Sequence, residues 1–173
     1  MSTDGTTSGR GPEDPVPAET FREAMSRWAS GVTVVTAEGP DGLAGMTASA
    51  FSALSLDPPL ILVCVAHSST QHDALIAAPG FAVHMLSHDQ HGLSNHFAQK
   101  GGDKFAGLDH RPGPFGAPLL DDVTVRLICA RDAAPVAGDH TILIGRVVEA
   151  EISDGEPLLH WNRSYHRLKR HTG

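Results

Sequence analysis

Residues 31–66 read GVTVVTAEGPDGLAGMTASAFSALSLDPPLILVCVA, and this stretch decides the fold class. Residues 31–37 are dense in β-branched side chains, which favour strands. The Gly-Pro-Asp-Gly run at 39–42 is a turn signature, so we expect a hairpin that pairs 31–37 with a strand at 43–52. After a break at 57–59, residues 60–66 are apolar at every position, as in a strand buried on both faces.

The rest of the chain continues this pattern. We expect further strands at 81–86, 123–129 and 140–152, a final strand or helical turn at 157–168, and a long loop at 100–118. Gly145 inside the long strand predicts a bulge or a barrel corner. Helices are expected at 18–29, 70–77 and 88–98 only. Many short strands with few helices indicate a mainly β protein, a barrel or a sandwich.

The first helix carries its own signals. Thr20 can act as N-cap with Glu23 three residues later, the spacing of a capping box. Phe21, Met25 and Trp28 then recur at helical spacing and predict one apolar stripe.

Length and composition predict one globular domain at 18–170, preceded by a disordered arm at 1–17. The chain has 173 residues, 40% of them hydrophobic and 19% charged, with a formal net charge of −7. That charge disfavours nucleic-acid and anionic-membrane partners. We expect neither a signal peptide nor a membrane-spanning stretch. Cys64 and Cys129 lie in apolar runs, so we expect buried thiols and a cytoplasmic protein.

Two stretches offer polar groups to a ligand. Residues 45–52 combine small residues with the hydroxyls of Thr47, Ser49 and Ser52, which suits a flat ligand close to the backbone; the alternative is a solvent-facing strand. Ser68-Ser69-Thr70 stands at the start of an expected helix, where free N–H groups suit a phosphate. The alternative there is plain N-capping, and the two roles are compatible.

Four histidines are candidates for catalysis or metal binding. His140 follows Gly-Asp at the start of the long strand, where it can stack on a ring or simply occupy a surface turn. His88, His91 and His96 share one stretch, but their spacing matches no HExxH pattern, so we expect no metal site. No GxSxG elbow and no GxGxxG turn is present, which disfavours a hydrolase and a Rossmann nucleotide site.

Taken together, these segments resemble the flavin reductase-like family, the small reductase partners of two-component flavin monooxygenases. The resemblance runs from about Phe21 to Leu168, and 45–65 is its most specific part. It is carried by the following runs: GVTVVTA (31–37), GMTASAFSALSLDPPLILVCV (45–65), SST (68–70), FAVHML (81–86), LSNHFAQKGGDKF (93–105), GDHTILIGRVVEAE (138–151) and PLLHWNRSYHRL (157–168). At His84 the family pattern often shows Asn instead, which puts a polar contact near the flavin in doubt.

The resemblance implies a split β-barrel of the FMN-binding, Greek-key-like kind, usually a homodimer, with FMN or FAD in a groove at the barrel and dimer surface. It assigns residues to the flavin and the nicotinamide as follows: Thr47, Ala48 and Ser49 at the polar edge of the isoalloxazine, Ser52 near the ribityl chain, Ser68, Ser69 and Thr70 at the phosphate, Phe97, Ala98 and Lys104 completing the phosphate and ribityl side, His140 at the nicotinamide and Tyr165 closing the site.

The implied activity is hydride transfer from NADH or NADPH to FMN or FAD, with the reduced flavin supplied to a partner monooxygenase. A flavin carries the hard chemistry itself, which fits a chain without an obvious catalytic triad. The alternative is a non-enzymatic flavin-binding protein on the same split barrel. A relative of pyridoxamine-phosphate oxidases is disfavoured, because the region after residue 100 is poor in the basic residues that a second phosphate needs. The sequence leaves FMN or FAD, NADH or NADPH, and bound or substrate flavin open.

Overall fold

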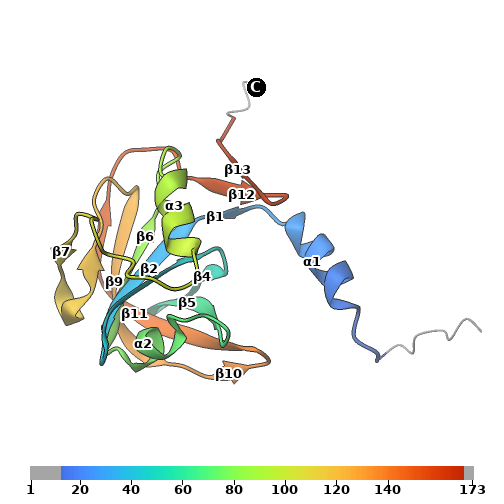
Figure 1. Cartoon of the computed structure of the whole chain (residues 1–173), viewed down its shortest axis with the longest axis horizontal. Coiled ribbons are helices and arrows are strands. Elements are labelled where there is room, and N and C mark those ends of the chain that lie inside the picture. The colour runs from blue at the N-terminus through green and yellow to red at the C-terminus, as the bar shows by residue number, and fades with distance from the viewer. Residues whose placement is uncertain (1–12, 170–173) are drawn as a thin grey trace, which may run out of the picture.

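An antiparallel sheet forms the body of the molecule (Figure 1). The computed structural model describes residues 13–169, so most of the arm expected at 1–17 lies outside the described residues. The strands run in the order β3-β2-β6-β9-β11-β5-β4, and β10 pairs with β11. Their bounds are β2 Thr33–Gly39, β3 Gly42–Ala48, β4 Phe51–Leu56, β5 Pro59–Ala66, β6 Gly80–Met85, β9 Val125–Ala133, β10 Val136–Ala137 and β11 His140–Ile152. Strands β3 and β4 are the two edges, and within residues 13–169 no strand pairing joins them.

Smaller elements lie around this sheet. A short sheet joins β1 (Ser30–Gly31) to the hairpin of β12 (Leu159–Trp161) and β13 (Ser164–His166). The helices are α1 (Ala18–Ser26), α2 (His72–Ala77) and α3 (His91–Ala98). The expected loop at 100–118 contains β7 (Arg111–Pro112) and the short helix η1 (Pro114–Gly116), and leads into β8 (Pro118–Leu119). The chain is therefore mainly β with three short α-helices in the described part, as the sequence predicts.

Two sequence signals are confirmed in detail. The Gly-Pro-Asp-Gly run forms the turn of the β2–β3 hairpin, with Gly39 paired to Gly42. In β11 the register with β9 shifts next to Gly145, which is the predicted irregularity. A Cβ at Gly145 would lie 2.4 Å from the Cζ atom of Phe81, so the buried ring occupies the space that a side chain would need.

Two strand predictions need correction. The single strand expected at 43–52 is two strands, because the chain leaves β3 at Ser49 and Ala50 and begins β4 at Phe51. Residues 60–66 are not buried on both faces: burial alternates, with Ile61, Val63 and Val65 inside and their neighbours half-buried. One face of β5 therefore remains open to a covering group.

Helix α1 also departs from its prediction. Its N-cap is Pro17, and no side chain caps it, so Thr20 is not the cap. It ends at Ser26, four residues before β1. None of its residues is buried, and the apolar stripe of Phe21, Met25 and Trp28 is exposed, Trp28 at 72%. Figure 1 shows α1 standing away from the sheet at the end of an extended connection.

His84 lies in the core on β6 and is fully buried. Its Nδ1 lies 3.1 Å from the carbonyl oxygen of Val34, and its Nε2 accepts a 3.1 Å hydrogen bond from the backbone N–H of Leu120. Burial lowers the pKa of His84 to about 4. The imidazole is therefore neutral, with Nδ1 as the donor, and it links β6 to the residues after β8 instead of facing a ligand.

Both cysteines are free, with Cys129 buried and Cys64 half-buried. Burial raises the pKa of Cys129 to about 12, which keeps that thiol protonated and inert. Among residues 13–169, no helix combines the length and apolar character needed to cross a membrane.

Candidate functional site

Three segments that are distant in sequence meet around a cavity of about 210 Å³, named here the hydroxyl cavity. They are the end of β3, the turn between β5 and α2, and the end of α3. Its lining residues are Met46, Thr47, Ala66, Ser68, Ser69, Thr70, Gln71, Phe97, Ala98, Gln99 and Lys100. Six of the predicted site residues are thus brought together: Thr47, Ser68, Ser69, Thr70, Phe97 and Ala98.

The turn between β5 and α2 presents three hydroxyls to this cavity. Helix α2 begins at His72 and not at residue 70, so Ser68, Ser69 and Thr70 stand in the turn itself. The Ser69 hydroxyl oxygen accepts a 3.2 Å hydrogen bond from the backbone N–H of Gln71. That bond leaves the hydroxyl proton of Ser69 available as a donor. Ser69 therefore shapes the turn and can also donate to an anion.

Gln71 connects this turn to β3. Its side-chain carbonyl accepts a 3.1 Å hydrogen bond from the backbone N–H of Gly45. Its amide nitrogen lies 3.4 Å from the hydroxyl of Thr70, an orientation in which it donates. Because the same side chain holds both walls, the position of the turn relative to β3 is fixed.

The end of α3 supplies the third wall and, among residues 13–169, the one cation that lines the cavity. That cation is Lys100, which is exposed. Lys104, the lysine predicted at the phosphate, does not line the cavity. It is 4% exposed, and its ammonium group donates to the carbonyl of Gln99. Lys104 thus shapes the loop after α3 from inside, while Lys100 faces the space.

The end of β3 lines the hydroxyl cavity, and the residues that follow the strand line a second hollow. Thr47 lines the first, and its hydroxyl donates a 2.6 Å hydrogen bond to the carbonyl of Ser94 in α3. Ala48 is buried, and its carbonyl accepts a 2.7 Å bond from the Thr33 hydroxyl. Ser49 leaves the strand and lines the second hollow. The predicted run 47–49 therefore passes from one space to the next.

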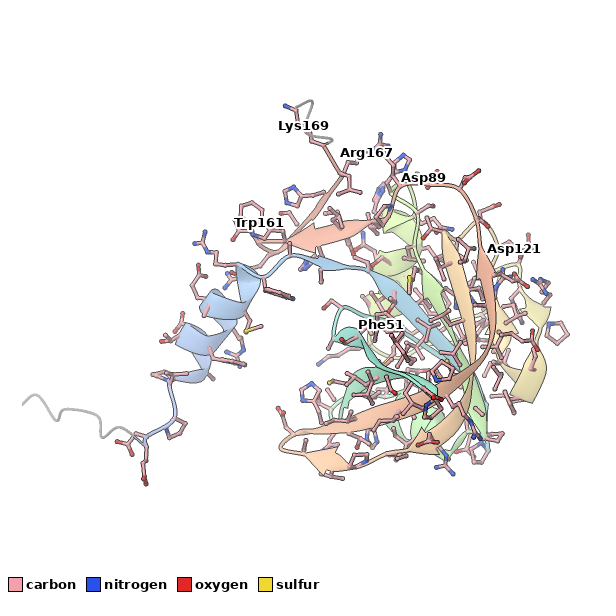
Figure 2. All side chains as sticks on the ribbon, turned by 180° about the vertical axis from the view of Figure 1, so that it is seen from behind. Phe51, Asp89, Asp121, Trp161, Arg167 and Lys169 are labelled. Carbon is pink, nitrogen blue, oxygen red and sulfur yellow. The ribbon has the colours of Figure 1, made fainter. Side chains whose placement is uncertain are left out.

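This second hollow, the α1 groove, has a volume of about 470 Å³ and lies between α1 and strands β4 and β5. Ser49 and Ser52 lie on its sheet side together with Phe51 and Cys64. In Figure 2, Phe51 lies on the side of the sheet that faces α1, and Trp161 lies beside the helix. The indole N–H of Trp161 donates a 3.1 Å bond to the carbonyl of Arg27, which links the β12–β13 hairpin to the residue after α1.

His140 begins β11 beside the turn between β5 and α2. It pairs with Ala66 in the sheet register, and the neighbouring Asp139 carbonyl accepts a 2.9 Å bond from the backbone N–H of His67. The Nδ1 atom of His140 lies 2.7 Å from the Asp139 carboxylate, and this hydrogen bond lowers the pKa of Asp139. In the neutral imidazole Nδ1 is then the donor, and Nε2 keeps a free lone pair.

Tyr165 on β13 contacts α3 without lining either hollow. Its hydroxyl donates a 2.9 Å hydrogen bond to the side-chain carbonyl of Asn95 and lies 2.9 Å from the Ser94 hydroxyl. Since Thr47 bonds the carbonyl of the same Ser94, Tyr165 holds the helix against the site from its far side.

Sequence reasoning missed several lining residues: Met46, Gln71 and Gln99 in the hydroxyl cavity, and Arg22, Met25, Trp28 and His160 in the α1 groove. Gln71 directly follows the three hydroxyl residues, so its position in the same turn could have been predicted from the sequence. The groove residues carry no such signal, because they depend on where α1 and the β12–β13 hairpin lie. Among residues 13–169, no cluster of His, Cys, Asp or Glu has the arrangement of a metal site.

A comparison with family models shows the class of protein. Residues 25–169 match the model of the flavin reductase like domain. The chain therefore belongs to this family, which defines the class of protein.

Particular relatives are similar over nearly the same span. The FMN reductase (NADH) SmoA of Agrobacterium fabrum is 42% identical over 153 residues, 88% of this chain and 87% of that protein. A NADH-dependent flavin reductase from a Rhodococcus species is 37% identical over 158 residues, 86% of this chain and 85% of the relative. Some relatives are longer: the chain spans only 43% of a probable flavin reductase of Rhizobium meliloti.

Solved structures show the same fold. The NADH:FAD oxidoreductase SgcE6 of Streptomyces globisporus, in complex with NAD and FAD fragments, superposes with a TM-score of 0.83 at 35% identity, covering 90% of this chain and 94% of that one. BorF, the flavin reductase component of a bacterial two-component tryptophan halogenase, superposes with a TM-score of 0.79 at 34% identity, covering 89% of this chain and 99% of that one.

Proposed function

We propose that this protein is an NAD(P)H:flavin oxidoreductase that reduces FMN or FAD and supplies the reduced flavin to a partner monooxygenase. The observation that carries the proposal is the hydroxyl cavity, in which three distant segments place hydroxyls, a lysine and the apolar Phe97 around one space. Relatives named as NADH-dependent FMN and flavin reductases, and a halogenase reductase component, support the assignment.

The residues of the hydroxyl cavity fit the phosphate end of a flavin. The hydroxyls of Ser68, Ser69 and Thr70 are donors, and Lys100 adds a positive charge. The α1 groove fits the flat ring, because small and aromatic side chains line it together with the hydroxyls of Ser49 and Ser52. A ligand that passes along residues 47–49 reaches both spaces. Two arginines, Arg22 and Arg163, also line the α1 groove and add positive charge there.

A bound flavin supplies the hydride acceptor, and a reduced nicotinamide supplies the hydride. The protein's tasks are to stack the two rings in register and to exclude water. His140 is our candidate for the nicotinamide contact, as the family resemblance implies; it begins β11 beside the turn of residues 68–70 and lines neither the hydroxyl cavity nor the α1 groove. No strong acid, base or nucleophile is required of the chain for this transfer.

We infer that the sheet is a split β-barrel and that two copies form a homodimer. Exposed apolar side chains support the dimer: Trp28 just after α1, Leu56 on β4 at 94% exposure, and Val148 and Ile152 on β11. A single copy leaves α1 without a buried residue. A partner copy that covers α1 and the open face of the sheet removes this apolar surface from water. The half-buried thiol of Cys64 agrees with a cytoplasmic location.

The testing experiment follows the loss of nicotinamide absorbance with purified protein, NADH or NADPH, and added FMN or FAD in separate runs. Turnover that rises with added flavin establishes the reductase and ranks the cofactors. Flavin binding without any nicotinamide oxidation would instead favour the non-enzymatic flavin-binding alternative. Absence of both would refute the assignment of either hollow to flavin.

A further inference from the structure

Two histidines flank the turn that carries Ser68, Ser69 and Thr70, and both reach the same hydroxyl. The Nε2 atom of His67, just before the turn, lies 3.2 Å from the Thr141 Oγ1 atom. The Nε2 atom of His72, just after the turn, lies 2.9 Å from that oxygen. The two rings meet edge to face with their centroids 5.1 Å apart.

The direction of these hydrogen bonds follows from Asp73. Its carboxylate lies 2.7 Å from the Nδ1 atom of His72, so Nδ1 carries the proton that bonds it. In the neutral ring Nε2 of His72 is then an acceptor, and the Thr141 hydroxyl donates to it. With its only proton used, the Thr141 oxygen accepts from Nε2–H of His67. One hydroxyl therefore satisfies both imidazoles, as donor to one and as acceptor from the other.

The sheet holds Thr141 in place on both sides. It is 2% exposed in β11, where it pairs with Val65 of β5 and with Val136 of β10. It also directly follows His140. The turn has backbone bonds of its own, from Ser69 N–H to the Ala66 carbonyl at 3.0 Å and from His72 N–H to the Ser69 carbonyl at 3.1 Å. A further backbone bond, from His67 N–H to the Asp139 carbonyl at 2.9 Å, ties the residue before the turn to the start of β11. The Thr141 contacts add side-chain links to β11 on both sides of the turn.

We propose that Thr141, acting through His67 and His72, is a positioning residue that sets the hydroxyls of residues 68–70 for the phosphate group of the flavin. The inference rests on the proposed function and adds to it a determinant of phosphate recognition outside the cavity lining. The proposal requires that loss of the Thr141 hydroxyl weakens binding of the phosphate and not of the flavin ring. The turn keeps its backbone hydrogen bonds in such a variant, and the α1 groove, proposed for the ring, is unchanged.

The test compares the dissociation constants of FMN and riboflavin, which differ only in the phosphate, for the wild type, Thr141→Val and Thr141→Ser. Valine keeps the shape of the side chain without the hydroxyl. We expect Thr141→Val to raise the dissociation constant of FMN about ten-fold, the effect of losing two modest hydrogen bonds, while that of riboflavin stays the same. Serine retains the hydroxyl and should restore FMN binding.

The outcomes separate this inference from the proposed function. Equal weakening of FMN and riboflavin by Thr141→Val, or no effect on either, overturns the positioning role. A wild type that binds FMN no tighter than riboflavin contradicts the phosphate assignment of the cavity itself. If Thr141→Val does not fold, His67→Ala carries the test, because this exposed side chain is one of the two links. It should weaken FMN binding selectively, and an unchanged ratio of the two constants refutes the proposal.

Discussion

The hydroxyl of Thr47 donates a 2.6 Å hydrogen bond to the carbonyl of Ser94, and this contact ties strand β3 to helix α3 beside the hydroxyl cavity. Because the Thr47 hydroxyl already donates its proton to Ser94, it can only accept a hydrogen bond from a ligand. Replacement by valine removes both the tie and the acceptor. We expect Thr47→Val to raise the KM for flavin about ten-fold, with the KM for NADH unchanged, in steady-state assays. Thr47→Ser is the matched control and should behave like the wild type.

His140→Ala tests the nicotinamide contact. Ring alignment governs hydride transfer, so we expect the kcat/KM for NADH to fall between ten- and about a hundred-fold while flavin affinity is retained. The measurement pairs nicotinamide oxidation rates with a flavin titration by fluorescence quenching. His110→Ala, an exposed histidine that lines neither hollow, is the control. Equal losses in reduction rate and flavin affinity would contradict the assignment of His140 to the nicotinamide.

Some residues of the hydroxyl cavity could be predicted from the sequence and others could not. The hydroxyls of Thr47 and of residues 68–70 could be proposed from the sequence because several hydroxyl and small residues are grouped within two short runs, 45–52 and 68–70. The assignment of Lys104 to the phosphate was wrong, since Lys100 and Lys104 stand in one Gly-rich stretch and only packing shows that the ammonium of Lys104 is buried. Thr141 carried no local signal at all. Its role depends on the register of β11 against β5, a long-range pairing that periodicity does not encode.

Strand position was readable wherever a local pattern existed. The bounds 140–152 predicted for β11 agree with the structure, because an alternating apolar run and the glycine inside it are both local. The end of β3 at Ser49 and Ala50 was not predicted. Small and hydroxyl-bearing residues occur both within strands and at strand ends, so the sequence does not mark where this strand stops. The exposure of the α1 stripe was also unreadable, because helical spacing shows that a face is apolar but not what covers it.

Protonation of His84 gives stability a specific pH dependence. The pKa of His84 is about 4 in the folded protein and about 6.5 when unfolded, so between these values the unfolded chain binds more protons. The free energy of unfolding should therefore fall as pH drops from 6.5 to 4, with His84 contributing about 3 kcal/mol of the loss. Urea titrations at several pH values measure this slope. His84→Asn should flatten it, and an unchanged slope would mean that other groups control acid sensitivity.

Gly145→Ala tests the close approach between β11 and β6. The added Cβ would meet the Phe81 ring at 2.4 Å, in a core where that ring is fully buried. We expect the free energy of unfolding to decrease by about 1–3 kcal/mol, the usual cost of overpacking, in chemical denaturation. Gly92→Ala is the matched control, because it lies in α3 with nothing within 4 Å of the added atom. Alanine favours a helix, so that variant should be neutral or slightly more stable.

The exposed apolar side chains of Phe21 and Met25 on α1 and of Trp28, two residues after the helix, predict that Trp28 holds the homodimer together. Trp28 is 72% exposed in a single copy, and burial of an aromatic side chain is a large part of the energy of many interfaces. Trp28→Glu places a charge on the apolar stripe, so we expect the variant to sediment as a monomer at concentrations where the wild type sediments as a dimer. Thr20→Glu adds the same charge to an exposed position outside the stripe and should remain dimeric. Since Trp28 also lines the α1 groove, the monomer should bind flavin more weakly; a Trp28→Glu dimer would instead show that the copies meet through another face.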